Sequence, residues 1–306
     1  MPIGIRPIND FAYKKVFGSP ANKLALISLL NAILSLRSPI VDLTIENPYN
    51  LQDFHDDKLS ILDIKATDQS GALYSIEMQL SIFTGLIQRI VFYGCEVYVG
   101  QLSAGQDYSN LKPVYSICLI DGIVWPDAQK IHHAFRLTDS ESSRTLAGTL
   151  EIHTLEFGRY NLQASDLVNA SLLQQWLYWL LHAHEYESAE LLRLFPQPAI
   201  QLATQTIVRI AEITEDKTMY DAREKAIRDQ QWALNASFRE GEIEGEIKGE
   251  IKGEIKGEMK GEIKLIQTLQ EILGESLFEA SELQGKSLEE LQAITTKLRT
   301  KMAKRG

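Results

Sequence analysis

The sequence has little cysteine, no long apolar run and no excess of basic residues. Its 306 residues include only Cys95 and Cys118, too few and too far apart for a disulfide framework or a metal knuckle, so we expect free buried thiols. No apolar run approaches the roughly 20 residues that a membrane-spanning helix needs. The first residues lack the charged and apolar regions of a signal peptide. We therefore expect a cytoplasmic protein without a membrane partner.

The charge balance is acidic. Lys and Arg number 31 against 41 Asp and Glu, and the formal net charge of −10 argues against a broad basic footprint on nucleic acid. A local patch of Lys and Arg around an acidic site is still compatible with DNA, with an affinity that is modest and sensitive to salt. At 44% hydrophobic residues, the chain can bury one sizeable core and carry an appendage.

The most informative stretch is residues 61–80, whose pattern predicts a β-hairpin. Two runs that alternate apolar and polar residues flank a cluster of turn formers at 68–71. A loop over 69–71 pairs Asp68 with Ala72 and places Asp63 opposite Glu77. One face of this hairpin is apolar apart from a phenol: Leu62, Ile64, Ala66, Tyr74, Ile76 and Met78. The other face is polar: Asp63, Lys65, Thr67, Ser75, Glu77 and Gln79.

Two carboxylates that face each other on a sheet, with Cβ atoms roughly 5 Å apart, repel one another mildly. A divalent cation removes that cost, and Mg²⁺ needs only one or two carboxylates besides water and phosphate oxygens. Such a site can activate water for in-line attack on phosphorus. An ordinary amphipathic hairpin with a solvated acidic face has the same spacing, so the hairpin alone leaves both interpretations open.

Further motifs narrow the interpretation. The chain contains Asp10-Phe-Ala-Tyr-Lys-Lys-Val-Phe-Gly18, Asp57-Lys-Leu-Ser-Ile-Leu-Asp63 and Gly105-Gln-Asp-Tyr-Ser-Asn-Leu-Lys-Pro-Val114, and a charged, glycine-punctuated tail follows residue 219. With the hairpin, these stretches resemble the PD-(D/E)XK nuclease superfamily, in which an Asp on one strand and Glu-x-Lys on the next hold the catalytic metal. More narrowly, they resemble the Rpn family of recombination-promoting nucleases and transposases, whose second motif ends in Gln.

The resemblance implies an α/β fold with a PD-(D/E)XK core over residues 1–160. This core would be a mixed sheet of three or four strands flanked by helices, with a strand at 40–46 beside the hairpin. A helical extension would occupy 161–235, a repeat stalk or linker 236–264 and a small helical module 265–306. The implied activity is that of a metal-dependent DNA endonuclease, which hydrolyses phosphodiester bonds and is linked to recombination or mobile elements.

The resemblance also implies roles for individual residues. Asp63 and Glu77 would bind Mg²⁺, with Mn²⁺ as the alternative ion, and Gln79 would position the attacking water. Gln79 departs from the usual Lys of the superfamily, and a neutral amide cannot act as a cationic stabiliser. Lys65 lies two residues beyond Asp63 on the same face. We therefore take Lys65 as the candidate for the missing positive charge, against the alternative of a surface Lys without a role.

Two pairs of residues are candidates for supporting roles. Asp10 and Lys14 match the first family motif, and they either contribute to the site, through metal-bound water or phosphate, or serve as a helix cap and a solvated Lys. Arg89 and Tyr93 lie one turn apart in a helix predicted over 84–104. Their spacing fits contact with phosphate and a buried tie to the acidic hairpin equally well.

The remaining patterns predict further core elements. Helices are expected at 20–34, from a cap at Ser165-Asp166 through residue 180, and at 198–213, and Gly105 is expected to close the helix at 84–104. Strands are expected at 114–120, 131–137 and 149–156. His132 and His133 are adjacent in a strand and point to opposite faces, so they do not readily ligate one metal ion. The Trp and Leu residues of 172–180 are typical of a core helix rather than a ligand site.

From Gly241 to Lys264 the sequence is close to Gly-Glu-Ile-Lys repeated six times. On a helix, its apolar stripe drifts by about 40° per repeat in a right-handed sense, because a period of four exceeds 3.6. Each glycine costs about 1 kcal/mol relative to alanine, and no opposite charges stand three or four residues apart to offset this cost. A self-associating helical stalk and a flexible charged linker are the two alternatives.

Beyond the repeat, 264–273 is amphipathic, and Ser287-Leu-Glu-Glu290 has the form of a capping box. We expect a two-helix module here and a homo-oligomer formed through the C-terminal helices. Two other functions fit the sequence: a catalytically inactive DNA-binding module with a nuclease-like fold, which Gln79 and the acidic charge favour, and an oligomeric defence or scaffold protein that depends on the tail. RNA is an alternative substrate.

Overall fold

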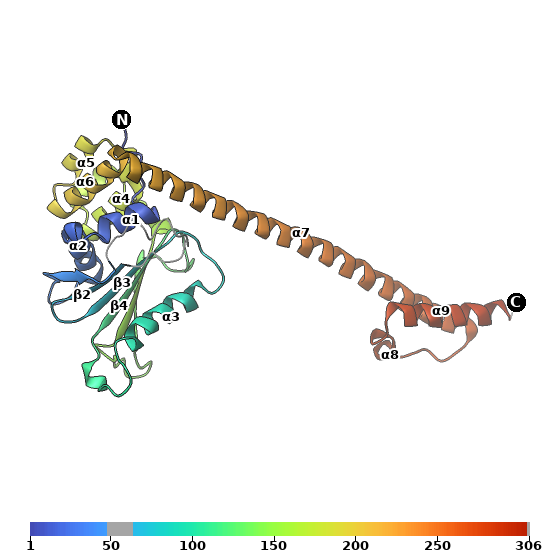
Figure 1. Cartoon of the computed structure of the whole chain (residues 1–306). Coiled ribbons are helices and arrows are strands. Elements are labelled where there is room, and N and C mark those ends of the chain that lie inside the picture. Colours follow the sequence, from blue (N-terminus) through green and yellow to red (C-terminus); the bar gives the residue numbers. More distant parts are fainter. Residues whose placement is uncertain (48–63, 305–306) are drawn as a thin grey trace. The chain divides into compact units, whose positions relative to one another are not determined.

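The computed structural model describes residues 1–47 and 64–304 (Figure 1). The chain divides into two compact units, Met1–Arg228 and Asp229–Gly306. Asp57 and Asp63, which the sequence places in and beside the hairpin motif, lie outside the described residues. The first unit contains the sheet, and the second unit contains helices.

The described strands form a six-stranded mixed sheet in the order β1-β2-β3-β4-β6-β5. Their bounds are β1 Leu43–Ile45, β2 Ile64–Asp68, β3 Leu73–Gln79, β4 Val114–Ile120, β5 His132–Arg136 and β6 Leu150–Glu156. The central pairs β3–β4 and β4–β6 are parallel, and the other pairs are antiparallel. The expected strand beside the hairpin is confirmed as β1, although it is shorter than 40–46. The expected three or four strands are too few, because β5 and β6 join the same sheet.

Helices cover both faces of this sheet (Figure 1). They are α1 Asp10–Phe17, α2 Lys23–Leu34, α3 Leu86–Val99, α4 Leu172–His182, α5 Ser188–Leu194 and α6 Pro198–Glu212. Leu86 and Ile90 of α3 pack on Cys118 and Ile120 of β4. The opposite face of the sheet, which carries Ile76 and Ile117, belongs to one large core with α1, α2, α4 and α6. The layering follows from strand alternation, which sends neighbouring residues of β3 and β4 to opposite helical layers.

Two predicted helix boundaries are wrong. The helix expected over 84–104 ends at Val99, where Gly100 is the C-cap, and Gly105 instead has a φ of 85° in the loop that follows. The helix expected to start at Ser165-Asp166 is α4, whose N-cap is Ser171 with a capping box to Gln174. Asp166 lies in the preceding 3₁₀ helix Ala164–Asn169. In both places the residue expected to mark the helix end lies in a turn or 3₁₀ helix next to the observed boundary.

The large core contains the two tryptophans of α4 that the sequence assigns to a core helix. Trp176 and Trp179 have no exposed surface. Each indole N–H finds an acceptor, Ser28 Oγ at 3.1 Å and Thr204 Oγ1 at 2.9 Å. Buried indoles need such partners, so the hydrogen bonds help to set where α4 lies against α2 and α6.

The long helix α7 Thr214–Leu273 begins in the first unit and continues through the repeat. In the second unit, α8 Ala280–Gln284 and α9 Leu288–Ala303 follow. A second core joins the end of α7 to α9, and it consists of Ile266, Leu269, Leu273, Leu283, Leu291 and Leu298. Ser287 and Glu290 form the expected capping box.

The repeat is helical rather than a flexible linker, whereas self-association of this helix stays a prediction. One detail of the expectation is wrong. Glu244 stands where the repeat has Lys, and its carboxylate lies 2.5 Å from Lys248 Nζ, an ion pair four residues apart. Of the described helices, none is both long and apolar enough to cross a membrane by itself; α1 joined to Pro20–Leu34 meets those criteria only as a pair bent by 67°.

Gly94 gives a test of how α3 lies on the sheet. A Cβ on Gly94 would stand 3.3 Å from Leu150 Cδ1 and from Ser116 Cβ. A leucine must therefore push α3 away from the sheet, and we expect Gly94→Leu to lower the free energy of unfolding by about 1–3 kcal/mol. Urea unfolding followed by tryptophan fluorescence measures the change.

Gly249→Leu is the matched control, because nothing lies within 4 Å of a Cβ at Gly249. We expect its fluorescence-detected unfolding midpoint to be no lower than that of the wild type, because leucine favours a helix more than glycine does. An unchanged midpoint for Gly94→Leu would contradict the close packing of α3.

Candidate functional site

The β2–β3 hairpin has the predicted register. Ile64 pairs with Ile76, Lys65 with Ser75 and Ala66 with Tyr74. The apolar face is buried in the large core, where Ile64, Ala66, Tyr74, Ile76 and Met78 are at most 4% exposed. Glu77 and Gln79 therefore lie on the other face, toward α3. Asp63, predicted opposite Glu77, is outside the described residues, and its position stays a prediction.

The turn of the hairpin is held by one carboxylate. Asp68 Oδ1 accepts hydrogen bonds from the backbone N–H groups of Ser70 at 2.8 Å and Ala72 at 3.1 Å, and Oδ2 accepts from Tyr74 Oη at 2.8 Å. Partial burial opposes ionisation of Asp68, but these hydrogen bonds hold its pKa below the usual value. Gly71 supplies the φ of 86° that closes the loop. The turn thereby determines which residues of β3 face α3.

Glu77 faces a cation from α3. Arg89 Nη2 lies 3.3 Å from Glu77 Oε1, longer than the 2.7–2.9 Å typical of a charge-assisted hydrogen bond. The Arg89 guanidinium lies 4.8 Å from the ring centroid of Tyr93, a cation–π distance. Arg89 Nε is buried and has no hydrogen-bond partner among the described residues. Arg89 thus ties α3 to the acidic hairpin, but its side chain is 31% exposed, so this tie is not a buried one. Contact of Arg89 and Tyr93 with phosphate stays a prediction.

Cys118 borders the same place. It pairs with Glu77 in the parallel register of β3 and β4 and is buried. Burial raises the pKa of its thiol, and the charge of Glu77 raises it further. The neutral thiol is thus an apolar neighbour of Glu77. The expected free thiols are confirmed, but Cys95 is exposed on α3, so the expectation that both are buried is wrong.

Gln79 and Lys65 lie on the same polar side of the hairpin as Glu77. Gln79 Nε2 donates to the carbonyl of Ser81 at 2.9 Å, which leaves the amide oxygen as the group that can accept from water. Lys65 is exposed and is paired with Ser75, one diagonal step from Glu77. Diagonal neighbours on a sheet are about 7–8 Å apart, within reach of a long side chain.

The polar face of the hairpin carries the Glu77 carboxylate and the Gln79 amide oxygen, which are oxygen ligands of the kind that Mg²⁺ or Mn²⁺ binds. The Glu77 side chain is 21% exposed, and its carboxylate contacts Arg89. Within the part of the chain that the structure describes, no group of three or more His, Cys, Asp or Glu is placed to hold a metal ion. A hard ion needs only one or two carboxylates. Glu77 fits that requirement, with Asp63 as the second ligand that the sequence predicts.

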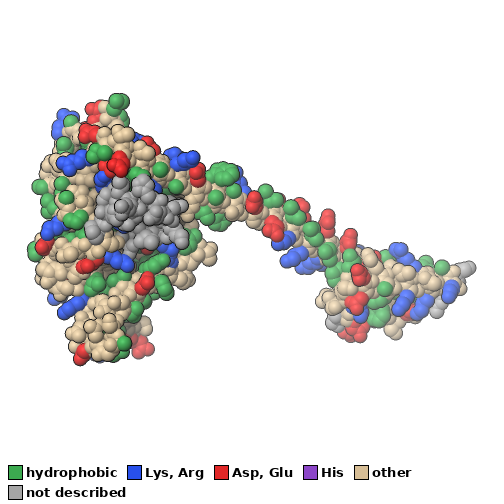
Figure 2. Space-filling view, in the orientation of Figure 1, with side chains coloured by type: hydrophobic (Ala, Val, Ile, Leu, Met, Phe, Trp, Pro, Cys, Tyr) green, Lys and Arg blue, Asp and Glu red, His purple; other side chains and the backbone are tan. Residues whose placement is uncertain are grey.

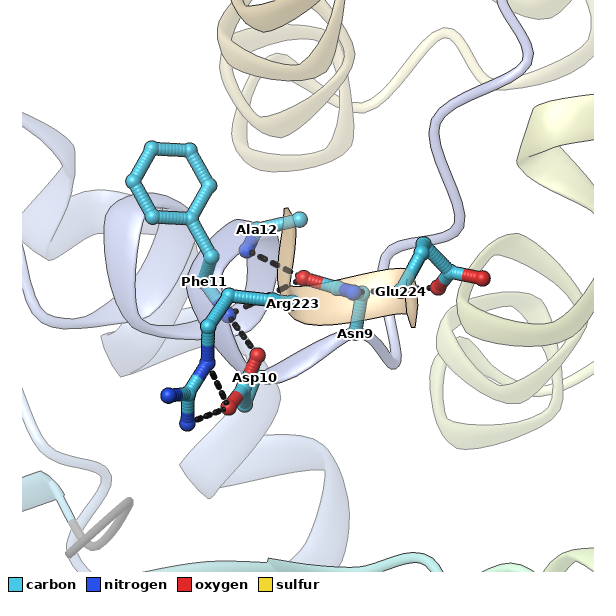
Figure 3. Close-up of polar contacts among 6 residues, drawn as sticks. All are labelled: Asn9, Asp10, Phe11, Ala12, Arg223 and Glu224. Carbon is cyan, nitrogen blue, oxygen red and sulfur yellow. Dashed lines mark hydrogen bonds and ion pairs between the residues drawn. The ribbon is translucent and has the colours of Figure 1, made fainter. Parts of the chain in front are cut away.

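Asp10 and Lys14 are both buried, and Figure 3 shows the contacts of Asp10. The N-cap of α1 is Asn9, whose side chain accepts hydrogen bonds from the N–H groups of Phe11 and Ala12. Asp10 is 1% exposed and forms an ion pair with Arg223 of α7. Arg223 Nε donates to Asp10 Oδ2 at 2.7 Å, and Nη2 donates to the same oxygen. Lys14 is 4% exposed. The alternative of a cap and a solvated Lys is therefore wrong for both residues.

Sequence reasoning missed the start of α7 as part of this arrangement. Asn9 Nδ2 donates to Glu224 Oε1 at 3.0 Å (Figure 3), and the Arg6 N–H donates to Tyr220 Oη at 2.9 Å. Lys15 pairs with Asp216. The buried residues Asp216, Tyr220 and Arg223 recur at helical spacing, and this period was the available signal.

The histidines of β5 are separated as expected. His132 Nε2 lies 2.9 Å from His153 Nδ1 of β6, while His133 Nε2 contacts the Lys130 carbonyl at 3.1 Å. Burial, and then the neighbouring charges of His132 and Arg136, lower the pKa of His153 to about 3. His153 is thus a buried neutral imidazole.

Comparison with known proteins gives one match. The family described as "PD-(D/E)XK nuclease family transposase" matches residues 7–237. No curated protein and no solved structure matches the chain. The matched range contains the hairpin, α3 and the start of α7, so it includes every candidate site residue and Arg223.

The Asp10–Arg223 pair predicts a large stability loss. Arg223→Met leaves the Asp10 carboxylate buried without its cation, and we expect the free energy of unfolding to fall by about 3–5 kcal/mol. Lys217→Met is the matched control on the same helix. It removes an exposed pair with Asp221 and should cost about 0–1 kcal/mol. Urea unfolding measures both, and equal losses would contradict the burial of Asp10.

His153 predicts a pH dependence. Its pKa is about 3 in the folded protein and 6.5 when exposed, so between these values the unfolded chain binds more protons. The stability from His153 is complete above pH 6.5 and falls with pH, by at most about 1.4 kcal/mol per pH unit. We expect His153→Gln to flatten the stability curve in this window. His182→Gln, which alters a 35% exposed ring, is the control; equal slopes for wild type and His153→Gln would contradict the prediction.

Proposed function

The chain belongs to the PD-(D/E)XK nuclease family transposases, and from this premise we propose that it is a metal-dependent DNA endonuclease linked to recombination or mobile elements. The observation that carries the proposal is the hairpin register, which turns Glu77 and Gln79 away from the core and toward Arg89.

The proposed metal ligands are Glu77 and Asp63, and the ion is Mg²⁺ or Mn²⁺. When bound, the ion supplies an activated water and neutralises charge on the phosphate. Gln79 orients that water through its amide oxygen, because its Nε2 is already held by the Ser81 carbonyl. Asp10 and Lys14 support the site from α1 through the position of that helix.

Two cations replace the Lys that the superfamily has in the position of Gln79. Lys65 lies on the polar face of β2 and supplies positive charge to the scissile phosphate. Arg89 balances Glu77 and, with Tyr93, contacts the phosphate backbone. The long 3.3 Å contact to Glu77 and the 31% exposure of the Arg89 side chain favour this role, because the Nη atoms retain donors for a second anion. The DNA affinity of so acidic a chain then depends on a local patch and decreases with salt.

One observation favours a second candidate function. The Gln79 amide is neutral and is held by Ser81, so the site lacks the usual cationic stabiliser at this position. The alternative is a catalytically inactive DNA-binding module, which binds DNA and does not cleave it at any metal concentration. We also infer self-association of the chain, through α7.

The test is cleavage of supercoiled plasmid by the purified protein with and without Mg²⁺. We expect metal-dependent nicking or linearisation that Asp63→Asn and Glu77→Gln each reduce by about 100-fold or more, because each removes charge that acts in the transition state. Glu141→Gln, which alters an exposed carboxylate on the loop between β5 and β6, should keep full activity. Equal faint cleavage by all variants would identify contamination and sink the nuclease proposal.

The same assay tests the cation. Lys65→Ala should lose cleavage while its thermal unfolding is unchanged, whereas Lys130→Ala, an exposed lysine before β5, should not. Full activity of Lys65→Ala would remove it from the site. Binding of plasmid without cleavage would favour the inactive module, and a parallel assay on RNA identifies the alternative substrate.

A further inference from the structure

The middle of α7 carries an uncovered apolar stripe. Ile243, Ile247, Ile251 and Ile255 are 57%, 51%, 50% and 45% exposed. Figure 2 shows hydrophobic side chains along this part of the helix. Large apolar side chains in a continuous row indicate a surface that another molecule covers.

The stripe continues into a packed interface. Met259 and Ile263 are the next two residues of the four-residue period, and they pack on the second core, which includes Leu291 and Leu298 of α9. Helix α9 therefore covers the C-terminal end of the same drifting stripe that lies open from Ile243 to Ile255. A helical partner is the occupant that this face already accepts.

The margins of the stripe carry opposite charges. Four-residue repeats place each Glu about 100° to one side of an Ile and each Lys about 100° to the other side, with Gly on the far side. The acidic margin is Glu242, Glu246, Glu250, Glu254 and Glu258. The basic margin is Lys248, Lys252, Lys256 and Lys260. Within 241–258, Glu244–Lys248 is the ion pair that the structure contains, so most of these charges are available to a partner.

The charge pattern selects both the partner and its orientation. When two identical helices pair in parallel about a two-fold axis, the left margin of one meets the right margin of the other, so Glu meets Lys on both sides. In an antiparallel pair, Glu would meet Glu and Lys would meet Lys, which is repulsive. We propose that residues 241–258 of α7 bind the same segment of a second copy of this chain in parallel, with the Ile stripes at the centre.

This pairing also accounts for the helix itself. Glycine recurs at every fourth position from 241 to 257, and nothing lies within 4 Å of a Cβ at any of them. Among the described residues, nothing thus packs on the glycine side of this segment, although helices in proteins depend mostly on packing. A second copy supplies it. Because the stripe drifts in a right-handed sense, the two helices wrap around each other in that sense.

The first experiment measures the mass of the full-length chain by light scattering during size-exclusion chromatography. The wild type should have twice the chain mass of 34.5 kDa. Two variants give both margins of the stripe the same charge and should be monomeric. The acidic variant carries Lys248→Glu, Lys252→Glu and Lys256→Glu. The basic variant carries Glu246→Lys, Glu250→Lys and Glu254→Lys. An equimolar mixture of the two should regain the doubled mass, because each acidic margin again meets a basic one.

The control makes the same charge change outside the segment, with Lys286→Glu, Lys297→Glu and Lys304→Glu, and should remain a dimer. A monomeric wild type at every concentration overturns the proposal. So does a doubled mass that both margin variants retain, because the dimer would then form elsewhere.

A second experiment tests the orientation. In a Cys95→Ser background, Ile243→Cys should form a disulfide with its own copy under mild oxidation, because a parallel pair brings equal residues together. Gly245→Cys, on the far side of the helix, should not. Cross-linking only in a mixture of Ile243→Cys and Ile255→Cys chains would indicate an antiparallel pair and overturn the proposal.

Discussion

The pairing of β2 with β3 is the constraint on which the candidate site depends. Side chains alternate along a strand, so a shift of one residue would send Glu77 into the core and Ile76 toward α3. Burial of Ile64 and Ile76 opposes that shift, as does the Asp68 turn with its hydrogen bond from Tyr74. The position of Glu77 beside Arg89 thus follows from apolar burial on the opposite face of the same strands.

Buried charges then connect segments that are far apart in the sequence. Asp10 and Arg223 are 213 residues apart, and their ion pair places the start of α7 against α1. Glu156 has no exposed surface; it accepts from the N–H groups of Val124 and Trp125 and pairs with Arg159. Replacing such a pair with apolar residues is often neutral or stabilising, whereas removing one partner is costly. Their contribution here is to select one arrangement of the helices.

The first unit and the repeat of α7 illustrate two ways in which helices are stabilised. The α4 helix is covered by its own chain, and its indoles find partners in α2 and α6. The repeat has a regular period, and its isoleucines from Ile243 to Ile255 are 45–57% exposed. In the proposed pairing, its regular charges contact a second copy of the chain, so that the repeated sequence would specify the orientation of the pair.

The sequence by itself determined the features that a local period encodes: the hairpin register, the buried tryptophans of α4, the capping box at Ser287 and the family. The first three depend on residues only a few positions apart, so a local pattern suffices to predict them, whereas the family depends on several motifs in order along the chain. Tertiary structure decided the rest. It added two strands to the expected sheet, ended α3 at Val99, exposed Cys95 and gave Asp10 its partner in Arg223. These outcomes depend on which faces of distant segments meet, and no local pattern in a single sequence specifies that meeting.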